Sequence, residues 1–198
     1  DLSSLDEDET PPILADADDD TKVQVEKAAD EDIIRFDLEG SEKMVLQRNA
    51  DSTAVLTFPN NRDNIFIGES AGQNSLSGED NLAFGKNALQ SDATGSRNIA
   101  IGNHALFHNH GLDDMVAVGD SALFNNGIGT PTGFESMYNT ALGSKTLLSN
   151  TLGYGNTAVG ARTLYANTTG NLNTGIGVFA LTANTTGVEN VGVGSGAL

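Results

Sequence analysis

Eight glycines recur at a nearly fixed period through the C-terminal two-thirds of this 198-residue chain. Successive spacings are 17, 17, 17, 24, 17, 17 and 17 residues, so the one long step contains a 7-residue insertion. The glycines are Gly68, Gly85, Gly102, Gly119, Gly143, Gly160, Gly177 and Gly194. Fixed-period similarity is typical of solenoids, and a 17-residue unit is too short to fold without its neighbours. The sequence therefore predicts an all-β fold, a parallel β-solenoid (β-roll) in which each repeat is one coil.

The residues next to each glycine suggest how a coil is built. The residue directly before it is large and apolar: Ile67, Phe84, Ile101, Val118, Leu142, Val159, Ile176 and Val193. The residue before that is Ala or Gly in seven of the eight repeats, and Leu recurs four residues after the glycine. Neighbouring strand residues point to opposite sides. We expect the large residue, such as Ile101, to lie in an apolar column, and the small one, such as Ala100, to form a smooth face that another backbone can approach.

Asparagine forms two rows in the repeats. It stands four residues before the glycine in seven repeats, at Asn64, Asn81, Asn98, Asn139, Asn156, Asn173 and Asn190, and Met115 replaces it in the eighth. A second, partial row contains Asn109, Asn126, Asn150, Asn167 and Asn184. Stacked amides can bond along a column, and Asn tolerates the left-handed backbone of tight turns. We interpret both rows as corner residues of the solenoid rather than as ligand-binding residues.

Composition divides the chain into three expected segments. Residues 1–15 are expected to form an acidic linker, residues 16–60 a small β-rich connector or cap, and residues 61–198 the eight-coil solenoid with its insertion near 126–138. The connector contains four β-like runs separated by turn-like spacers: Lys22–Glu26, Asp32–Leu38, Lys43–Leu46 and Thr53–Phe58. Both ends of the sequence are expected to be cuts in a longer protein or limits of an ordered part.

The charge and residue inventory exclude several function classes. A net charge of −17 repels nucleic acid and anionic membrane surfaces, so neither is expected as a partner. No apolar run approaches the roughly 20 residues of a membrane helix, so no membrane insertion is expected in this segment. The chain has no cysteine, and its three histidines lie within 7 residues of one another. Because no nucleophile–base–orienting constellation can be built from these residues, we expect no enzyme and no catalytic residue.

Two groups of residues have the character of metal ligands. His108 and His110 form a His-x-His pair that could surround an axial transition metal in a symmetric fibre, and exposed turn histidines are the alternative. Asp16, Asp18 and Asp20 have the spacing of calcium-loop oxygens, but the glycine and glutamate of a helical calcium hand are missing. That helical site is rejected, and a looser calcium site between strands stays open. No cofactor is assigned.

The repeats also resemble a known family. The runs NIAIGNHAL (Asn98–Leu106), NTALGSKTL and NTAVGARTL resemble the head repeats of trimeric autotransporter adhesins. They are more similar still to the NTAIG…AL…NTTG repeats of bacterial surface and tail-fibre-domain proteins, whose NTTG element corresponds to Asn167–Gly170 and Asn184–Gly187. The resemblance covers about residues 16–198, although the adhesin head repeat is commonly shorter.

This resemblance implies an extracellular homotrimeric fibre. The expected function is that of a structural and adhesive subunit of a bacterial cell-surface filament, which attaches to surfaces, cells or prey through an unknown receptor or glycan. The alternative is a receptor-binding tail fibre of a phage or contractile injection system. The residues give their own reason for self-association, because each coil offers few large apolar positions and thin cores rely on oligomerisation. A trimer is expected, and higher cyclic symmetry is allowed.

The insertion is the last feature with a functional interpretation. It contains Pro131 and several glycines, which cannot continue a strand ladder, so we expect an exposed loop with stacking resumed at Asn139. Phe134, Met137 and Tyr138 are candidate contact residues of this loop, since insertions in solenoids gather on the binding face. The alternative is a tolerated insertion without a recognition role.

Overall fold

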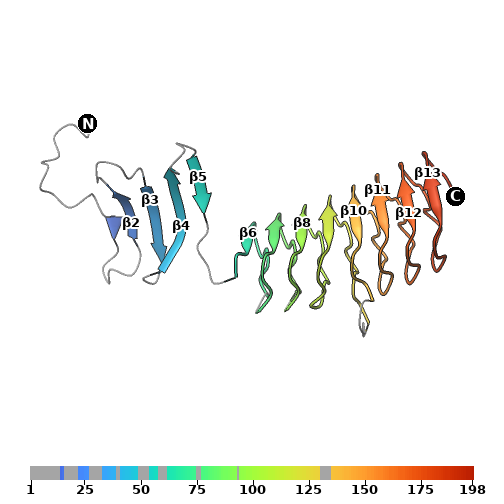
Figure 1. Cartoon of the computed structure of the whole chain (residues 1–198), viewed down its shortest axis with the longest axis horizontal. Helices are drawn as coiled ribbons and strands as arrows, with labels where there is room; N and C mark the ends of the chain where they lie inside the picture. Colours follow the sequence, from blue (N-terminus) through green and yellow to red (C-terminus); the bar gives the residue numbers. More distant parts are fainter. Residues whose placement is uncertain are drawn as a thin grey trace, which may run out of the picture. The chain divides into compact units, whose positions relative to one another are not determined.

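The computed structural model describes residues 62–198 apart from 75–76, 93 and 130–134, together with five strands nearer the N-terminus. The chain divides into two compact units, Asp1–Asp63 and Asn64–Leu198. The described residues form thirteen strands and no helix (Figure 1), which confirms the all-β prediction. Within the described residues, nothing has the helical length and apolar character that crossing a membrane would require.

The first unit contains a five-stranded antiparallel sheet whose strands follow one another in chain order. These are β1 (Leu14–Ala15), β2 (Lys22–Glu26), β3 (Ile33–Leu38), β4 (Ser41–Arg48) and β5 (Ala54–Thr57). The four expected runs correspond to β2–β5. Strand β1 is a correction, because it falls inside the expected linker: Leu14 pairs with Val23, and Ala15 with Lys22. These two apolar residues extend the sheet, and the other residues of that linker lie outside the described residues.

The second unit is a parallel β-solenoid, as the glycine period predicts. Each coil contributes one three-residue strand: β6 (Ile65–Ile67), β7 (Leu82–Phe84), β8 (Ile99–Ile101), β9 (Val116–Val118), β10 (Thr140–Leu142), β11 (Thr157–Val159), β12 (Thr174–Ile176) and β13 (Val191–Val193). All pairs are in register, so Ala100 lies beside Ala117. The register also holds across the insertion, where Val116 pairs with Thr140.

The periodic glycine is required by both its backbone angle and its surroundings. Gly85 has φ +133°, a conformation that L side chains rarely adopt. A Cβ atom at this position would lie 2.7 Å from the carbonyl carbon of Gly102 in the next coil. The other periodic glycines up to Gly177 meet the following glycine in the same way. Glycine therefore allows successive coils to stack with their backbones in contact.

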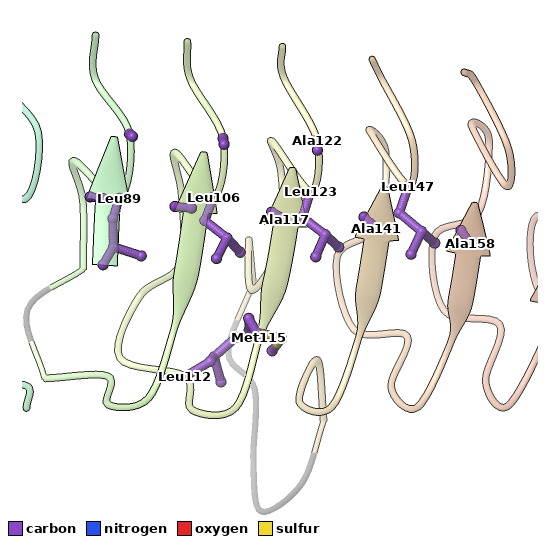
Figure 2. Packing of buried hydrophobic residues seen from close by; sticks show 14 of the residues in the cluster. Leu89, Leu106, Leu112, Met115, Ala117, Ala122, Leu123, Ala141, Leu147 and Ala158 are labelled. Carbon is purple, nitrogen blue, oxygen red and sulfur yellow. The ribbon is translucent and has the colours of Figure 1, made fainter. Parts of the chain in front are cut away.

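The core lies inside the coils and uses the small strand residues (Figure 2). The central alanines of five strands are fully buried: Ala83, Ala100, Ala117, Ala141 and Ala158. So are the leucines four residues after the glycine in five coils, at Leu89, Leu106, Leu123, Leu147 and Leu164. The prediction that the residue before the glycine lies in the apolar column is wrong, since Ile101 is 36% exposed and Phe84 is 53% exposed.

The width of the coil explains this reversal. At Gly175, which takes the place of the central alanine in β12, an added Cβ would already meet the Cγ2 atom of Thr163 at 2.5 Å and the Cδ1 atom of Leu164 at 3.7 Å. The opposite wall is thus close enough that strands β7–β13 direct only a small residue inward. In β6 the central residue is Phe66, which packs against the core, and Gly72 replaces the leucine of that coil. The predicted smooth outer face of Ala and Gly is therefore also wrong, because these residues pack inside their own chain.

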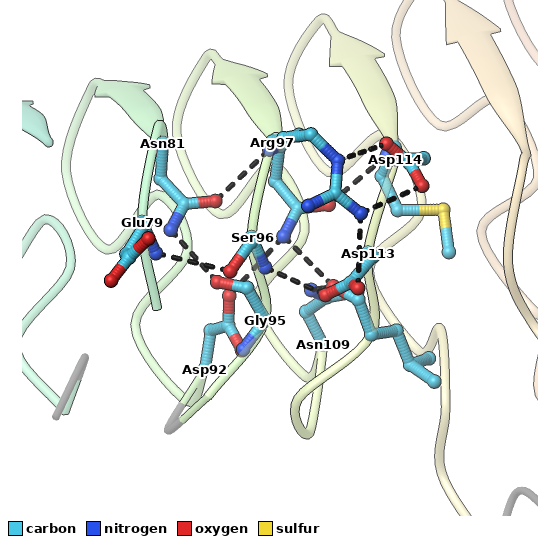
Figure 3. Close-up of polar contacts among 12 residues, drawn as sticks. Glu79, Asn81, Asp92, Gly95, Ser96, Arg97, Asn109, Asp113 and Asp114 are labelled. Atoms are coloured by element: carbon cyan, nitrogen blue, oxygen red, sulfur yellow. Dashed lines mark hydrogen bonds and ion pairs between the residues drawn. The ribbon is translucent and has the colours of Figure 1, made fainter. Parts of the chain in front are cut away.

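The first asparagine row fastens each coil to the next (Figure 3). The side-chain oxygen of Asn81 accepts the backbone N–H of Asn98 at 2.9 Å. Its amide nitrogen donates to the carbonyl oxygen of Gly95 at 2.8 Å. The same pair of contacts recurs in later coils, for example from Asn156 to Asn173 and Gly170. Because these amides are buried with their partners, the row acts as an internal clamp between coils.

Candidate functional site

The most extensive candidate site is the outward side of the solenoid sheet. We define the outer sheet face as the first and third residues of strands β6–β13. It contains Ile65, Ile67, Leu82, Phe84, Ile99, Ile101, Val116, Val118, Thr140, Leu142, Thr157, Val159, Thr174, Ile176, Val191 and Val193. None of these residues is buried, although thirteen of them are apolar and none is charged. The central residue of each strand faces the other way, into the coil.

This outer sheet face is one continuous exposed apolar surface. Eight strands at about 4.8 Å spacing, each about 10 Å long, cover roughly 400 Å² before side-chain relief is counted. Contiguous apolar patches beyond a few hundred Å² mark interaction sites on soluble proteins. The large residues before the glycines are predictable from sequence. Their outward direction is not, because the alternating pattern is compatible with either set of strand residues facing the core.

The histidine cluster lies against aromatic side chains. The rings of Phe107 and Phe124 stack with 5.1 Å between their centroids, and His108 meets the edge of both. His110 is 5.8 Å from His108 between ring centroids, and His104 packs near both phenylalanines. Burial, followed by the charge of His110, holds the pKa of His108 below its ordinary value. A lowered pKa favours the neutral imidazole, which suits packing against phenylalanine.

The structure describes one of the two candidate metal sites, the histidine pair, but not the aspartates. Within the described residues, no group of three or more His, Cys, Asp or Glu side chains is placed to hold a metal ion. His108 and His110 are thus brought together without a third protein ligand from the described part of the same chain. Asp16, Asp18 and Asp20, the proposed calcium ligands, lie outside the described residues.

The ends of the insertion are fastened by the asparagine rows. The amide nitrogens of Asn126 and Asn139 both donate to the carbonyl oxygen of Ser136, at 3.0 and 2.9 Å. Ser136 thereby occupies the place that Gly153 has in the next coil, where the amides of Asn139 and Asn150 donate to its carbonyl oxygen. The insertion is consequently confined to residues 127–135, and the coil resumes at Ser136, three residues earlier than expected.

This boundary changes the position of the candidate contact residues. Met137 and Tyr138 follow Ser136 and occupy regular repeat positions, Met137 packed against the core and Tyr138 49% exposed. Tyr138 has φ +60°, as Asp114 has φ +61° at the equivalent position of the preceding coil. Phe134 lies outside the described residues. The contact role of all three residues stays a prediction.

Two polar features were not predicted from the sequence. Arg97 contacts Asp113 and Asp114 of the next coil at 3.1 and 2.7 Å (Figure 3), and this guanidinium lowers the pKa of Asp114. Asp92 stands in the second asparagine row, one repeat before Asn109, and is fully buried. Burial raises the pKa of Asp92 despite the N–H groups that donate to its carboxylate. The 17-residue spacing to Asn109 was the available signal for this replacement.

Comparisons with family models, with curated proteins and with solved structures gave no match for this chain. Function is therefore inferred from the residues and their geometry. The outer sheet face is the feature that carries most weight, because it extends over all eight coils and its residues recur in register. The histidine–phenylalanine cluster and the insertion are each confined to one part of the solenoid.

Proposed function

We propose that this chain is a structural and adhesive subunit of an extracellular bacterial cell-surface filament. Identical chains associate side by side through the outer sheet face, as a parallel, in-register homotrimer. The filament carries no catalysis and attaches the cell to surfaces, other cells or prey through a receptor or glycan. The trimer and the adhesive role follow the resemblance of the repeats, and the association face follows the geometry of the strands.

The observation that carries the proposal is the contiguous, uncharged apolar surface of β6–β13. In a single chain, Ile67 is 40% exposed, Ile176 is 43% exposed and Phe84 is 53% exposed. Leaving these side chains in water costs free energy that burial against identical chains recovers, at about 25 cal/mol for each Å² removed from water. Copies arranged around one axis cover the faces in a closed assembly.

The regular hydrogen bonding between coils supports a mechanical role. The backbone N–H of Leu89 donates to the carbonyl oxygen of Ala105 at 2.9 Å, and that of Leu106 to Ala122 at 3.0 Å. The strands are paired in register on one wall, and such turn contacts join the coils elsewhere. Eight coils make a segment of roughly 38 Å at about 4.8 Å per strand. A filament built from such segments gains length by adding coils while its cross-section stays constant.

The assembly is tested with three single substitutions and light scattering coupled to gel filtration. The unmodified chain is expected at three chain masses. Ile101→Asp should give a folded monomer, because the introduced carboxylate is solvated in the monomer but would lose its water in the trimer. Asn103→Asp, an exposed change two residues away, should remain trimeric. Ala100→Asp should fail to fold, because Ala100 is fully buried in its own coil. A stable folded monomer of the unmodified chain would contradict the assembly.

The cellular role needs a separate experiment. Antibodies against residues 64–198 should label filaments on the surface of the source cells in immunogold electron microscopy. A mutant cell without the chain should lose both the label and attachment to its surface or prey. Gold particles on phage-like or contractile particles would instead favour the tail-fibre alternative and would contradict the cell-surface filament.

A further inference from the structure

The sheet of the first unit also has an accessible apolar face. Val23 pairs with Phe36 and Phe36 pairs with Met44, while Ile34 pairs with Leu46. Cross-strand partners and alternate residues of a strand share a face. None of the five is buried, since four are half-buried and Leu46 is 42% exposed. We call these five residues the N-terminal sheet face.

The N-terminal sheet face is uncharged within a strongly acidic unit. Residues 1–63 contain 18 acidic and 6 basic side chains, a net charge of −12. Yet all five residues of the face are apolar, whereas the alternate position of β2 and β3 contains Gln24 paired with Arg35. Segregation of apolar residues into one set of alternate positions is the pattern of a sheet that packs one face against another layer.

The size of this face decides what can cover it. The five residues lie on β2, β3 and β4. Three strands about 4.8 Å apart, with about four residues each at 3.4 Å rise, give roughly 200 Å². Stable protein–protein interfaces bury about 800 Å² on each partner. An independent partner would therefore be held weakly by this surface. A partner that another contact already holds nearby can bind through a smaller interface, because its local concentration is high.

The short connection between the two units keeps such a partner nearby when the solenoids associate. Strand β5 ends at Thr57 and the solenoid unit begins at Asn64, so six residues separate them. Six residues span at most about 20 Å when extended. If the solenoids associate, the first units of all copies are held within a few tens of Å, where short tethers give local concentrations of about millimolar.

We propose that the N-terminal sheet face docks onto the N-terminal sheet faces of other copies of this chain in the assembled fibre. The inference rests on the proposed association of the solenoids, which brings the copies together. A second copy fits because it presents the same uncharged apolar surface, and because closed symmetry buries every copy of the face at once. The fibre then has a second set of contacts between chains, separate from the outer sheet face.

Cysteine cross-linking tests this docking in the full chain. The sequence contains no cysteine, so one introduced residue supplies the only thiol. Met44→Cys places the thiol on the N-terminal sheet face, and Val45→Cys is the matched control, because neighbouring strand residues alternate between faces. After oxidation or treatment with a short bismaleimide, Met44→Cys should give at least tenfold more covalent dimer than Val45→Cys. Adding Ile101→Asp to Met44→Cys should return the dimer to background at micromolar concentration.

The outcomes separate this inference from the proposed function. Light scattering first establishes whether the chain is an oligomer. If it is, and Met44→Cys cross-links no more than Val45→Cys, the docking is overturned and the solenoid assembly stands. A monomeric unmodified chain would overturn both. Cross-linking of Met44→Cys that persists with Ile101→Asp would show that the first units associate without the solenoid, which contradicts the tethering argument.

Discussion

The side-chain oxygen of Asn139 accepts the backbone N–H of Asn156 at 2.9 Å, one coil further along the chain. The contact positions the residue that directly precedes the next strand, so one side chain sets the register of two coils. Met115 interrupts this row, and the coil step that follows it is the one with the insertion. There, the amides of Asn126 and Asn139 converge on Ser136 instead.

Asn156→Ala should destabilise the solenoid strongly. The substitution leaves the buried backbone N–H of Asn173 without its acceptor. It also removes one of the two amides, those of Asn156 and Asn167, that donate to the carbonyl oxygen of Gly170. Each buried polar group left unsatisfied costs about 1–3 kcal/mol. We expect the free energy of unfolding to fall by about 1–3 kcal/mol in chemical denaturation followed by circular dichroism. Asn103→Ala, at an exposed position, should change it by less than about 1 kcal/mol. Equal effects of the two substitutions would contradict the clamp.

The sequence was sufficient to predict the two rows of residues that the backbone requires, the periodic glycines and the corner asparagines. Glycine at φ near +130° and asparagine at a clamped corner tolerate few replacements, so both rows recur at a visible period. The direction of the strand faces was not predictable in this way. Ala100 inside with Ile101 outside, or the reverse, gives the same alternation, and the choice depends on the distance between the two walls of the coil. The turn at Leu106 was not predictable either. This residue has φ +50°, and leucine in a sequence does not indicate a left-handed backbone.

Gly143→Ala should be far more damaging than Gly194→Ala. Both residues have positive φ, +134° and +120°, so both variants acquire backbone strain of about 1–3 kcal/mol. Only at Gly143 does an added Cβ also meet backbone, 2.7 Å from the carbonyl carbon of Gly160. No atom lies within 4 Å of the equivalent position at Gly194. Thermal unfolding should therefore show a large loss for Gly143→Ala and a small one for Gly194→Ala, and similar losses would refute close stacking.

Asp92→Asn should stabilise the solenoid at neutral pH. An amide retains an acceptor for the N–H groups of Gly95 and Gly111, and its nitrogen can donate to the carbonyl oxygen of Gly95, as Asn150 does to Gly153. This restored bond is worth about 1 kcal/mol in the free energy of unfolding. Asp120→Asn, an exposed carboxylate change, serves as the control and should have little effect.

The pH dependence of that gain follows from the raised pKa of Asp92. The folded chain favours the protonated acid, so this group's contribution to stability is present below its ordinary pKa of 3.8. It is lost as pH rises through the higher pKa of the folded state. The advantage of Asp92→Asn should thus be smallest in acid and should increase towards neutral pH in denaturant titrations. An advantage that is constant with pH would show that desolvation of this carboxylate is not the cause.

Deletion of residues 128–134 should leave the fold and the assembly unchanged. The deletion removes seven of the nine residues between Asn126 and Ser136, which restores the two-residue spacing found between Asn150 and Gly153. The anchors remain, because Ser136 still accepts the amides of Asn126 and Asn139, and the N–H of Gly127 still donates to Thr151 at 2.9 Å. Light scattering and circular dichroism should match those of the unmodified chain.

The same deletion tests the contact role predicted for the insertion. If the loop takes part in recognition or in lateral contact, the shortened chain should lose retention on target surfaces, or bundling in electron micrographs, while it remains folded. Tyr138→Ala examines the neighbouring repeat position, which the deletion leaves in place, and separates its contribution from that of the loop. Unchanged retention and bundling after the deletion would show that the insertion is only tolerated by the solenoid. Loss of folding would show instead that residues 128–134 are part of the coil.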